Sequence, residues 1–329
     1  MMDDDPLRKT IMTHAMAFTQ CSGVQIAAAA DIDKTRLRKF GERWSVKCLY
    51  TDYVNMLTKE HIDILSICTH SDSHYEIVEK AIEINNGLKA VFCEKPIAGT
   101  LEEARKMVTL CRKKGIVLAV NHQRRLDSHY RKIKSMLDAG RIGKIQNIIF
   151  YYSGGLANIG THVFDLLLFL FGEVKSVLAD SCNSANSRIK DPDISGKLHF
   201  NGDIPCYLIA CNVDDHLMFE LDIIGTTGRI RSLSNGSILN LYKAGSSLKY
   251  SNYKELGDAP KEIRVHENQR MICAVNDIMR CIKSRKQPDC SGEDGYGALE
   301  IAAAFFESMK KKKKVNLPVK NRKEIIFSK

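Results

Sequence analysis

The sequence predicts an α/β protein of two domains. A parallel-sheet domain is expected at residues 1–122 and an α+β domain, with a large and mostly antiparallel open sheet, at residues 123–329. Three observations predict this arrangement. Strand-like and helix-like segments alternate up to residue 120, strand-like segments follow one another without helices between residues 174 and 242, and a length of 329 residues is typical of two domains.

In the first domain, apolar runs predict strands at residues 24–30, 62–69, 90–93 and 116–120. Helices are expected between them, at residues 34–44, at residues 74–84 and from residue 101 onward. Ser73 with Glu76, and Thr100 with Glu103, have the spacing of capping boxes at the start of the last two helices. Strands that alternate with helices in this way form a parallel sheet covered on both faces.

In the second domain, helices are expected at residues 130–139, 158–171, 268–284 and 295–310, and a loop at residues 245–260. Strands are expected at residues 144–152, 174–180, 197–200, 206–212, 218–224, 228–232 and 238–242. Consecutive strands without crossover helices indicate a largely antiparallel sheet.

The composition excludes several classes of function. The net charge is +10, but the lysine run 310–314 ends a predicted helix and has no interleaved aromatic residues, so no nucleic-acid partner is expected. The most apolar run, residues 163–171, is about half as long as a bilayer-spanning helix, so no membrane partner is expected. The eleven cysteines include no C-x-x-C pair, so free thiols and no metal site are expected. Free thiols and the lack of a secretory signal predict a cytoplasmic protein.

Two motifs carry residues suited to proton transfer. Lys95, within the tripeptide Glu-Lys-Pro, directly follows the apolar strand 90–93. His162 stands on the opening turn of an apolar helix, with Asn158 four residues before it and Asp165 three residues after it. These spacings place the three polar side chains on one helical face.

These residues belong to an ordered set of short motifs along the chain. With this set, the chain resembles the Gfo/Idh/MocA family of NAD(P)-dependent oxidoreductases, which includes glucose-fructose oxidoreductase and inositol dehydrogenase. The motifs are Thr13-His14-Ala15, Asp31, Thr69-His70-Ser71-Asp72-Ser73-His74, Glu94-Lys95-Pro96, Arg124-Arg125, Asn158 with His162 and Asp165, Ser291-Gly292-Glu293-Asp294, and Ala298-Leu299-Glu300. The resemblance covers nearly the whole chain. It implies a Rossmann-like nucleotide domain, hydride transfer at a sugar-like secondary alcohol, and a homo-oligomer formed through the C-terminal sheet.

The chain departs from the family pattern in three places. The family has a strand and a glycine-rich turn just before the position of Thr13, but residues 6–12 contain no glycine, so the first Rossmann strand is expected to be missing. His70 stands where the family usually has proline, and Asn158 where many members have aspartate. Two explanations fit the first departure: the strand and loop lie upstream of Met1, or the chain is a degenerate homologue that holds a dinucleotide poorly.

Oxidation of a secondary alcohol removes a hydride, which the cofactor accepts, and a proton, which a general base accepts. His162 is expected to be the main base, because an imidazole titrates near neutral pH. Lys95 is expected to polarise the substrate oxygen and to relay the proton, with partial desolvation lowering its pKa. Asn158, Asp165 and Arg125 are expected to bind or orient the substrate, a sugar-like molecule for which an anionic form is one alternative.

Cofactor contacts are expected where strands of a parallel sheet end. Asp31 follows the strand 24–30, where a carboxylate binds an adenosine ribose and repels a 2′-phosphate, so NAD is favoured over NADP. The full set of expected cofactor-binding residues is Asp31, Thr69, Ser71, His74, Glu94, Lys95 and Arg124. His74 and Arg124 also have structural interpretations, in a first helical turn and as a solvated arginine.

The sequence therefore predicts an oxidoreductase that transfers a hydride between NAD(H) and a secondary alcohol or ketone of a sugar, nucleotide sugar or cyclitol. Two alternatives remain open. One is a hydrolase or lyase of the same superfamily that uses bound NAD transiently, and the other is a non-catalytic ligand-binding homologue.

Overall fold

A computed structural model describes residues 10–85, 87–183, 191–202, 204–257, 259–266 and 269–326. Contacts divide the chain into two compact units. The first comprises Met1–Ala98, Glu102–Leu126 and Asn268–Glu293, and the second comprises Gly99–Leu101, Asp127–Glu267 and Asp294–Lys329. This division differs from the linear one expected at residue 122, because a late helix, α8 (Arg270–Ser284), belongs to the first unit. Residues 1–9, which include most of the segment expected to lack the glycine-rich turn, lie outside the described residues.

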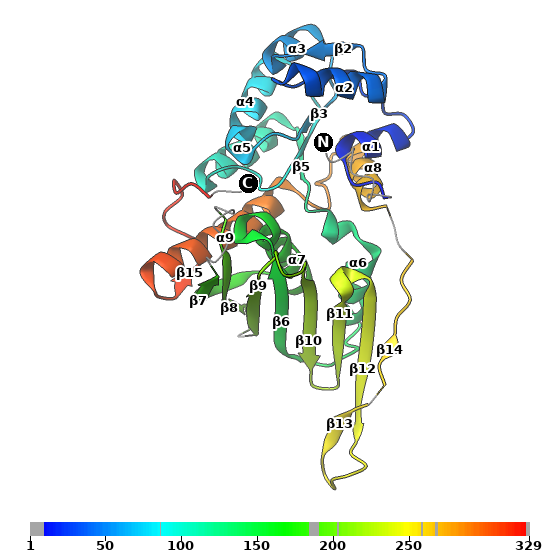
Figure 1. The fold of residues 1–329 in the computed structure, drawn as a ribbon, viewed down its shortest axis with the longest axis vertical. Coiled ribbons are helices and arrows are strands. Elements are labelled where there is room, and N and C mark those ends of the chain that lie inside the picture. Colours follow the sequence, from blue (N-terminus) through cyan, green and yellow to red (C-terminus); the bar gives the residue numbers. More distant parts are fainter. Residues whose placement is uncertain are drawn as a thin grey trace. The chain divides into compact units, whose positions relative to one another are not determined.

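Every strand pair in the first unit is parallel, which confirms the expected parallel sheet. The strands are β1 (Ala28–Ala30), β2 (Cys48–Tyr50), β3 (Ile64–Ile67), β4 (Ala90–Cys93) and β5 (Val117–Val120). The helices are α1 (His14–Gln20), α2 (Lys34–Trp44), α3 (Tyr53–Lys59), α4 (His74–Ile84), α5 (Leu101–Lys114) and α8. Figure 1 shows α1 and α8 on one side of β3–β5, and α4 and α5 on the other.

The core on the α1 and α8 side is built from small and aromatic side chains. Phe92 of β4 and Ala119 of β5 pack with Ala17 and Phe18 of α1 and with one apolar face of α8. The α8 residues buried there are Met271, Ala274, Val275, Ile278 and Cys281, at the i, i+3, i+4 and i+7 spacing of an amphipathic helix. Helix α8 is therefore an integral layer of the first unit, although about 150 residues of sequence separate it from β5.

The parallel sheet is in two pieces. Strands β1 and β2 pair only with each other, and β3, β4 and β5 form a separate sheet in that order. Among the described residues no strand precedes α1 and none joins β1 to β3. This is the position at which the first strand of a Rossmann sheet is central.

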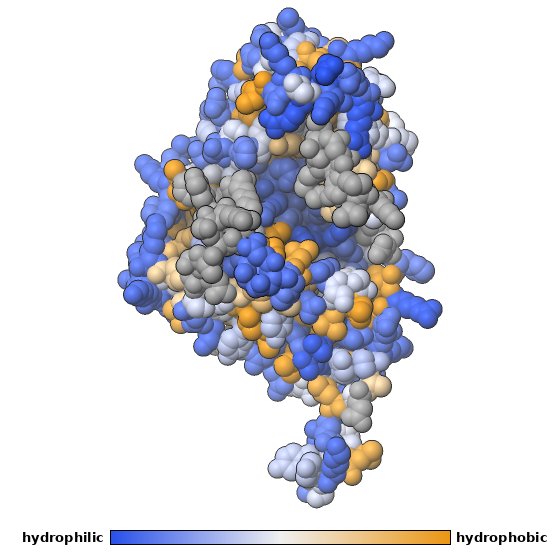
Figure 2. Space-filling view, in the orientation of Figure 1, coloured by the Kyte–Doolittle hydropathy of each residue, from blue (hydrophilic) through white to orange (hydrophobic). Residues whose placement is uncertain are grey.

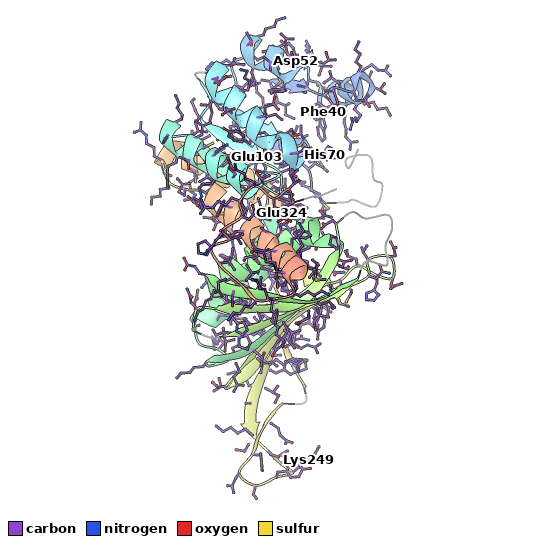
Figure 3. All side chains as sticks on the ribbon, turned by 90° about the vertical axis from the view of Figure 1, so that its left-hand side faces the viewer. Phe40, Asp52, His70, Glu103, Lys249 and Glu324 are labelled. Atoms are coloured by element: carbon purple, nitrogen blue, oxygen red, sulfur yellow. The ribbon has the colours of Figure 1, made fainter. Side chains whose placement is uncertain are left out.

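Two short elements were not expected from the sequence, and one expected cap is wrong. Strand β2 and helix α3 are only three and seven residues long, and Asp52 caps α3 by accepting from the backbone N–H of Val54. Ser73 does not form the predicted capping box. Its one hydroxyl hydrogen is shared instead between Thr69 Oγ1 and the carbonyl oxygen of His70, each 2.8 Å from Ser73 Oγ, which stabilises a 3₁₀ turn, η2 (Ser71–Ser73), before α4. Figure 3 labels His70 at the start of this turn.

The second unit has one large sheet, in the order β13-β12-β11-β10-β6-β9-β8-β7-β15, with β14 paired to β12. Among the strands of the described residues, only β6 and β9 are parallel neighbours, so the expected mostly antiparallel sheet is confirmed. The strands are β6 (Ile145–Ser153), β7 (Val174–Asn183), β8 (Asp193–Phe200), β9 (Pro205–Cys211), β10 (Phe219–Gly225), β11 (Gly228–Leu233), β12 (Ile238–Ser246), β13 (Lys254–Leu256), β14 (Lys261–Glu262) and β15 (Val315–Asn316).

One face of this sheet is covered by α6 (Ser128–Asp138), α7 (Thr161–Phe171) and α9 (Gly292–Lys311). Phe164 of α7 stacks on Phe305 of α9, with ring centroids 5.5 Å apart. Tyr130 of α6 meets Phe219 of β10 edge to face. On the opposite face, Tyr207 and Ile209 of β9 are 36% and 37% exposed. The expectation that this sheet mediates oligomerisation stays a prediction.

Strands β12 and β13 continue past the sheet edge as a hairpin, where the sequence predicted only a loop. Ala244 pairs with Leu256, and Figure 3 labels Lys249 near the hairpin tip. Leu248 and Tyr253 are strongly exposed, and the tip stands out from the surface in Figure 2.

Of the eleven cysteines, ten have described side chains and all ten are free thiols.

The interrupted sheet makes a prediction about local stability. A two-stranded sheet is marginal by itself, whereas β4 has partners on both sides. We expect amide hydrogens of Ala29 and Leu49 to exchange at least about tenfold faster than those of Phe92 and Ala119, because local opening of the small sheet breaks few contacts. Hydrogen exchange measured by NMR or mass spectrometry tests this. Equal protection would mean that β1 has a further strand partner.

Candidate functional site

The C-terminal ends of β3, β4 and β5 bring chemically active side chains to one edge of the first unit. Because the strands are parallel and in register from Ile67 through Cys93 to Val120, the residues that follow them emerge together. Glu94 continues the ladder by donating its N–H to the carbonyl oxygen of Ile67 at 2.9 Å, and Asn121 donates its N–H to that of Cys93 at 2.8 Å. Lys95 follows directly, and its peptide bond to Pro96 is cis.

The Glu94 carboxylate is held by groups from three elements. Its Oε1 atom accepts from Asn121 Nδ2 at 2.7 Å and lies 3.1 Å from His14 Nε2, at the first residue of α1. Its Oε2 atom accepts the backbone N–H of Lys95 at 3.2 Å. The other ring nitrogen of His14 lies 2.7 Å from Ser66 Oγ, on β3. The loop that carries Lys95 is thus fixed to α1, β3 and β5.

Two buried histidines at this edge differ in charge: one is a cation and the other is neutral. Burial alone would lower the pKa of His14, but its contacts with Cys68 and Glu94 outweigh burial and raise that pKa well above its usual value. Burial opposes ionisation of Glu94, yet the bonds from His14 and Asn121 hold its carboxyl pKa well below its usual range. His122, next to Asn121, has its pKa lowered to about 3, first by burial and then by the charges of Lys95 and Arg125. At pH 7 His14 is therefore a cation and His122 is neutral.

His74 lies in the interior and does not reach the edge with its side chain. It is fully buried, its Nε2 atom lies 3.1 Å from the carbonyl oxygen of Thr69, and its Nδ1 atom lies 3.2 Å from Cys93 Sγ and from the carbonyl oxygen of Ile97. Burial lowers the pKa of His74 and raises that of the Cys93 thiol, so both stay neutral. We assign the proton to Nε2, with the thiol donating to Nδ1. The ring links the end of β3 to the loop after Lys95. Within the described residues, the contacts of the His74 side chain are therefore structural.

The other expected cofactor residues lie at the same ends of strands. Asp31 follows β1, and its Oδ1 atom accepts the N–H of Asp33 at 2.8 Å and lies 3.6 Å from Arg36. Ser71 is buried in η2, and Thr69 is exposed and accepts from Ser73. Arg124 and Arg125 lie in η3 (Gln123–Leu126), and the buried Arg125 donates to the carbonyl oxygen of Asp289 at 3.2 Å.

In the second unit, the helix α7 positions the other candidate base. His162 is its second residue, 6% exposed, and Asp165 one turn later is fully buried. Asn158 does not lie on α7 as expected but in the preceding π-helical turn, η4 (Gly155–Gly160), where its Nδ2 atom donates to the carbonyl oxygen of Gly154 at 3.2 Å. The wider π turn changes the register between Asn158 and His162 from that of a single α-helix.

Two aspartates that the sequence analysis missed hold this π turn in place. Asp191 accepts the N–H of Ala157 at 2.9 Å and that of Asn158 at 2.8 Å, through its two oxygens. Asp193 accepts the N–H groups of Gly154 and Gly155 through one oxygen, and burial raises its pKa. Both carboxylates are buried and satisfy backbone donors that the start of a helix leaves unpaired. The D-x-D pattern was visible in the sequence, but its partners are more than thirty residues away.

The edge of the first unit fits a dinucleotide in part. Asp31 stands at the end of β1 with its carboxylate about one-third exposed, and Asn121 Oδ1 is a buried acceptor with no hydrogen-bond partner among the described residues. An amide or hydroxyl donor of a ligand would satisfy that acceptor. Residues 10–13, before α1, contain no glycine, so the described residues offer no glycine-rich turn for the pyrophosphate.

Within the residues that the structure describes, no set of His, Cys, Asp and Glu side chains is arranged to hold a metal ion. None of the helices in the same residues has the length and apolar character needed to cross a membrane.

The clamp on the π turn makes a prediction. In Asp191→Asn, an amide replaces a carboxylate that accepts two backbone N–H groups, so one of them is left facing a donor. We expect the free energy of unfolding to fall by about 1–3 kcal/mol, measured by urea denaturation. The matched control is Asp180→Asn, at an exposed position of β7, with an expected change within about 0.5 kcal/mol. Equal effects at the two positions would contradict the clamp.

Comparisons with known proteins agree with this geometry. Residues 10–122 match the oxidoreductase family with an NAD-binding Rossmann fold, and residues 152–317 match the C-terminal alpha/beta domain of the same family. The chain is 26% identical to D-apiose dehydrogenase of Paraburkholderia graminis, over 92% of this chain and 86% of the relative, and 30% identical to the uncharacterized oxidoreductase YrbE of Bacillus subtilis, over 90% of each. The fold is similar to that of levoglucosan dehydrogenase in complex with NADH and levoglucosan, with a TM-score of 0.79 and 20% identity over 93% of this chain and 95% of that one. The chain belongs to the Gfo/Idh/MocA family of oxidoreductases.

Proposed function

We propose that this protein is an NAD-dependent oxidoreductase that transfers a hydride between NAD(H) and a secondary alcohol or ketone of a sugar, nucleotide sugar or cyclitol. The observation that carries the proposal is the position of Lys95. It emerges at the C-terminal edge of the parallel sheet, within a domain of the NAD-binding family, and ligands of open α/β sheets bind at that edge.

Each unit supplies one proton-handling side chain. His162, at the start of α7, acts as the main general base and accepts the proton of the substrate hydroxyl. Lys95 binds the substrate oxygen and stabilises the negative charge that develops on it. NAD, when bound, accepts the hydride. Asn158 binds a substrate hydroxyl through its amide, and Asp165 and Arg125 orient neighbouring groups.

The substrate class is supported by the relatives. D-apiose dehydrogenase and levoglucosan dehydrogenase are named for a sugar and an anhydrosugar, and the latter was solved with NADH. The chemistry of the candidate residues agrees, because an imidazole, an amine and a primary amide all form hydrogen bonds with hydroxyl groups. Transient use of NAD in hydrolysis, or ligand binding without turnover, would appear in the following test as substrate loss without NADH, or as binding alone.

The proposal is tested by removing the two proton-handling groups separately. We expect Lys95→Ala and His162→Ala each to lower kcat by roughly 10²–10⁴-fold, since each removes a positioned acid–base group, while NAD still binds by fluorescence titration. Turnover is followed as NADH absorbance with a panel of sugars, sugar acids, UDP-sugars and inositols. Lys89→Ala is the matched control, because this lysine is half exposed and pairs only with Asp63 among the described contacts. Wild-type turnover in both active-site variants would refute the proposal.

Cofactor choice is predicted from the carboxylate after β1. Asp31→Asn removes the charge that repels a 2′-phosphate and one of the two carboxylates that pair with Arg36, the other being Asp33, so we expect the ratio of kcat/KM for NADP to that for NAD to rise about tenfold or more. Arg36→Ala keeps the carboxylate and removes the cation, so the ratio is expected to fall. An unchanged ratio in Asp31→Asn would show that this residue does not contact the ribose.

A further inference from the structure

The reaction proposed above does not use the contact between His14 and Glu94. The two side chains nevertheless form hydrogen bonds with residues from two further strand ends, Ser66 and Asn121. His14 is only 5% exposed. Its ring stacks on Phe92, with centroids 3.9 Å apart and planes 16° from parallel. Both ring nitrogens face oxygen atoms, Ser66 Oγ at 2.7 Å and Glu94 Oε1 at 3.1 Å.

The contacts determine how the His14 protons are placed. Nε2 lies 3.1 Å from a Glu94 oxygen, which can only accept, and 3.3 Å from Asn121 Nδ2, which already donates to the same oxygen, so we place a proton on Nε2. Nδ1 faces the hydroxyl of Ser66, which can accept a hydrogen bond from a protonated Nδ1 and donate its own hydrogen toward Cys68 Sγ at 3.7 Å. The ring is therefore placed to be an imidazolium that donates in two opposite directions.

The same contacts divide the Glu94 carboxylate between its neighbours. One oxygen is shared by the His14 ring and the Asn121 amide, and the other accepts the backbone N–H of Lys95. A carboxylate next to an amine ordinarily keeps that amine protonated. Here a second cation, His14, lies against the carboxylate and offsets its charge.

We propose that His14 is a positioning residue for the Lys95 amine: as the cation paired with Glu94, it fixes the Glu94–Lys95 backbone and weakens the hold of the carboxylate on the amine. The inference deepens the proposed function and rests on it for one of three tests. His14 itself contacts neither Lys95 nor, in this scheme, the substrate.

The charged and titratable groups around this pair come from three strand ends. Cys68 follows β3 and faces His14, Glu94 and Lys95 follow β4, and His122 follows β5. His122 is neutral at pH 7, so it adds no charge to the pair. Helix α1 contributes His14 alone, since its remaining residues are not titratable.

The first test is independent of activity. Histidine ring signals followed by NMR in the wild-type protein should show His14 charged at pH 8, where an ordinary histidine is neutral. In Glu94→Gln the same ring should titrate at least one unit lower, because its anionic partner is gone. A neutral His14 at pH 8 in the wild type, or an unchanged titration in Glu94→Gln, would overturn the ion pair.

The second test measures the Lys95 amine directly. Its acetylation rate as a function of pH, read by mass spectrometry with Lys89 as internal reference, gives the pH at which the amine loses its proton. In His14→Phe, which keeps the ring on Phe92 but not the charge, this midpoint should rise by about one pH unit. In Glu94→Gln it should fall, and the double variant should follow Glu94→Gln. A purely structural role would give no shift, or shifts of the same sign, and either result would overturn the proposal.

The third test uses turnover. We expect kcat of His14→Phe to fall by roughly tenfold or more, since a small displacement of a reacting group is costly, while the KM for NAD rises less than threefold. His14→Gln keeps a neutral donor and should recover part of kcat. His61→Phe, the same change at an exposed histidine, should leave kcat unchanged. Equal kcat in His14→Phe and wild type would overturn the positioning role. If the wild type turns over no substrate, the proposed function fails, and the NMR and acetylation tests still decide the role of His14.

Discussion

The arrangement of the first unit depends on the pairing of the buried His14 with the partly buried Glu94, which joins α1 to the ends of three strands. Burying two charges stabilises a structure only when their remaining hydrogen bonds are satisfied, and here Ser66, Asn121 and the N–H of Lys95 satisfy them. The pair has a defined pH window. The contribution of Glu94 is present above the ordinary carboxyl pKa and is lost as pH falls through its lowered value. That of His14 is present below the ordinary imidazole pKa and is lost as pH rises through its raised value.

The same pairing explains how α1 keeps its place next to an interrupted sheet. In a continuous Rossmann sheet, the strand before the first helix would hold it. Here Ala17 and Phe18 pack against Phe92, and α8, from late in the chain, covers them. The position of α1 therefore rests on side-chain packing and on one ion pair, with no contribution from backbone pairing to a described strand.

The sequence was informative where the structure is local. The helix Lys34–Trp44 and the strand Ala90–Cys93 were predicted with their observed ends, because Asp33 is a strong cap and Glu-Lys-Pro ends an apolar run. The sequence was uninformative about contacts between residues that are far apart in the chain. An amphipathic pattern shows that α8 has an apolar face but not which unit covers it, and nothing local in Asp191 indicates partners in η4. His14 belonged to a recognised motif, but its charge depends on Glu94, eighty residues later.

The two buried histidines at the end of the sheet differ in charge. The Glu94 carboxylate lies 3.1 Å from His14 and favours its cation, whereas burial is the largest influence on His122. Burial first, and then the charges of Lys95, Arg125 and Arg124, lower the pKa of His122 and keep it neutral, so His122 adds no charge to the three cations beside it. A concentrated positive field attracts anions, and a dinucleotide carries its negative charge on the pyrophosphate. The described residues offer no glycine-rich turn, whose backbone amides would otherwise meet that negative charge.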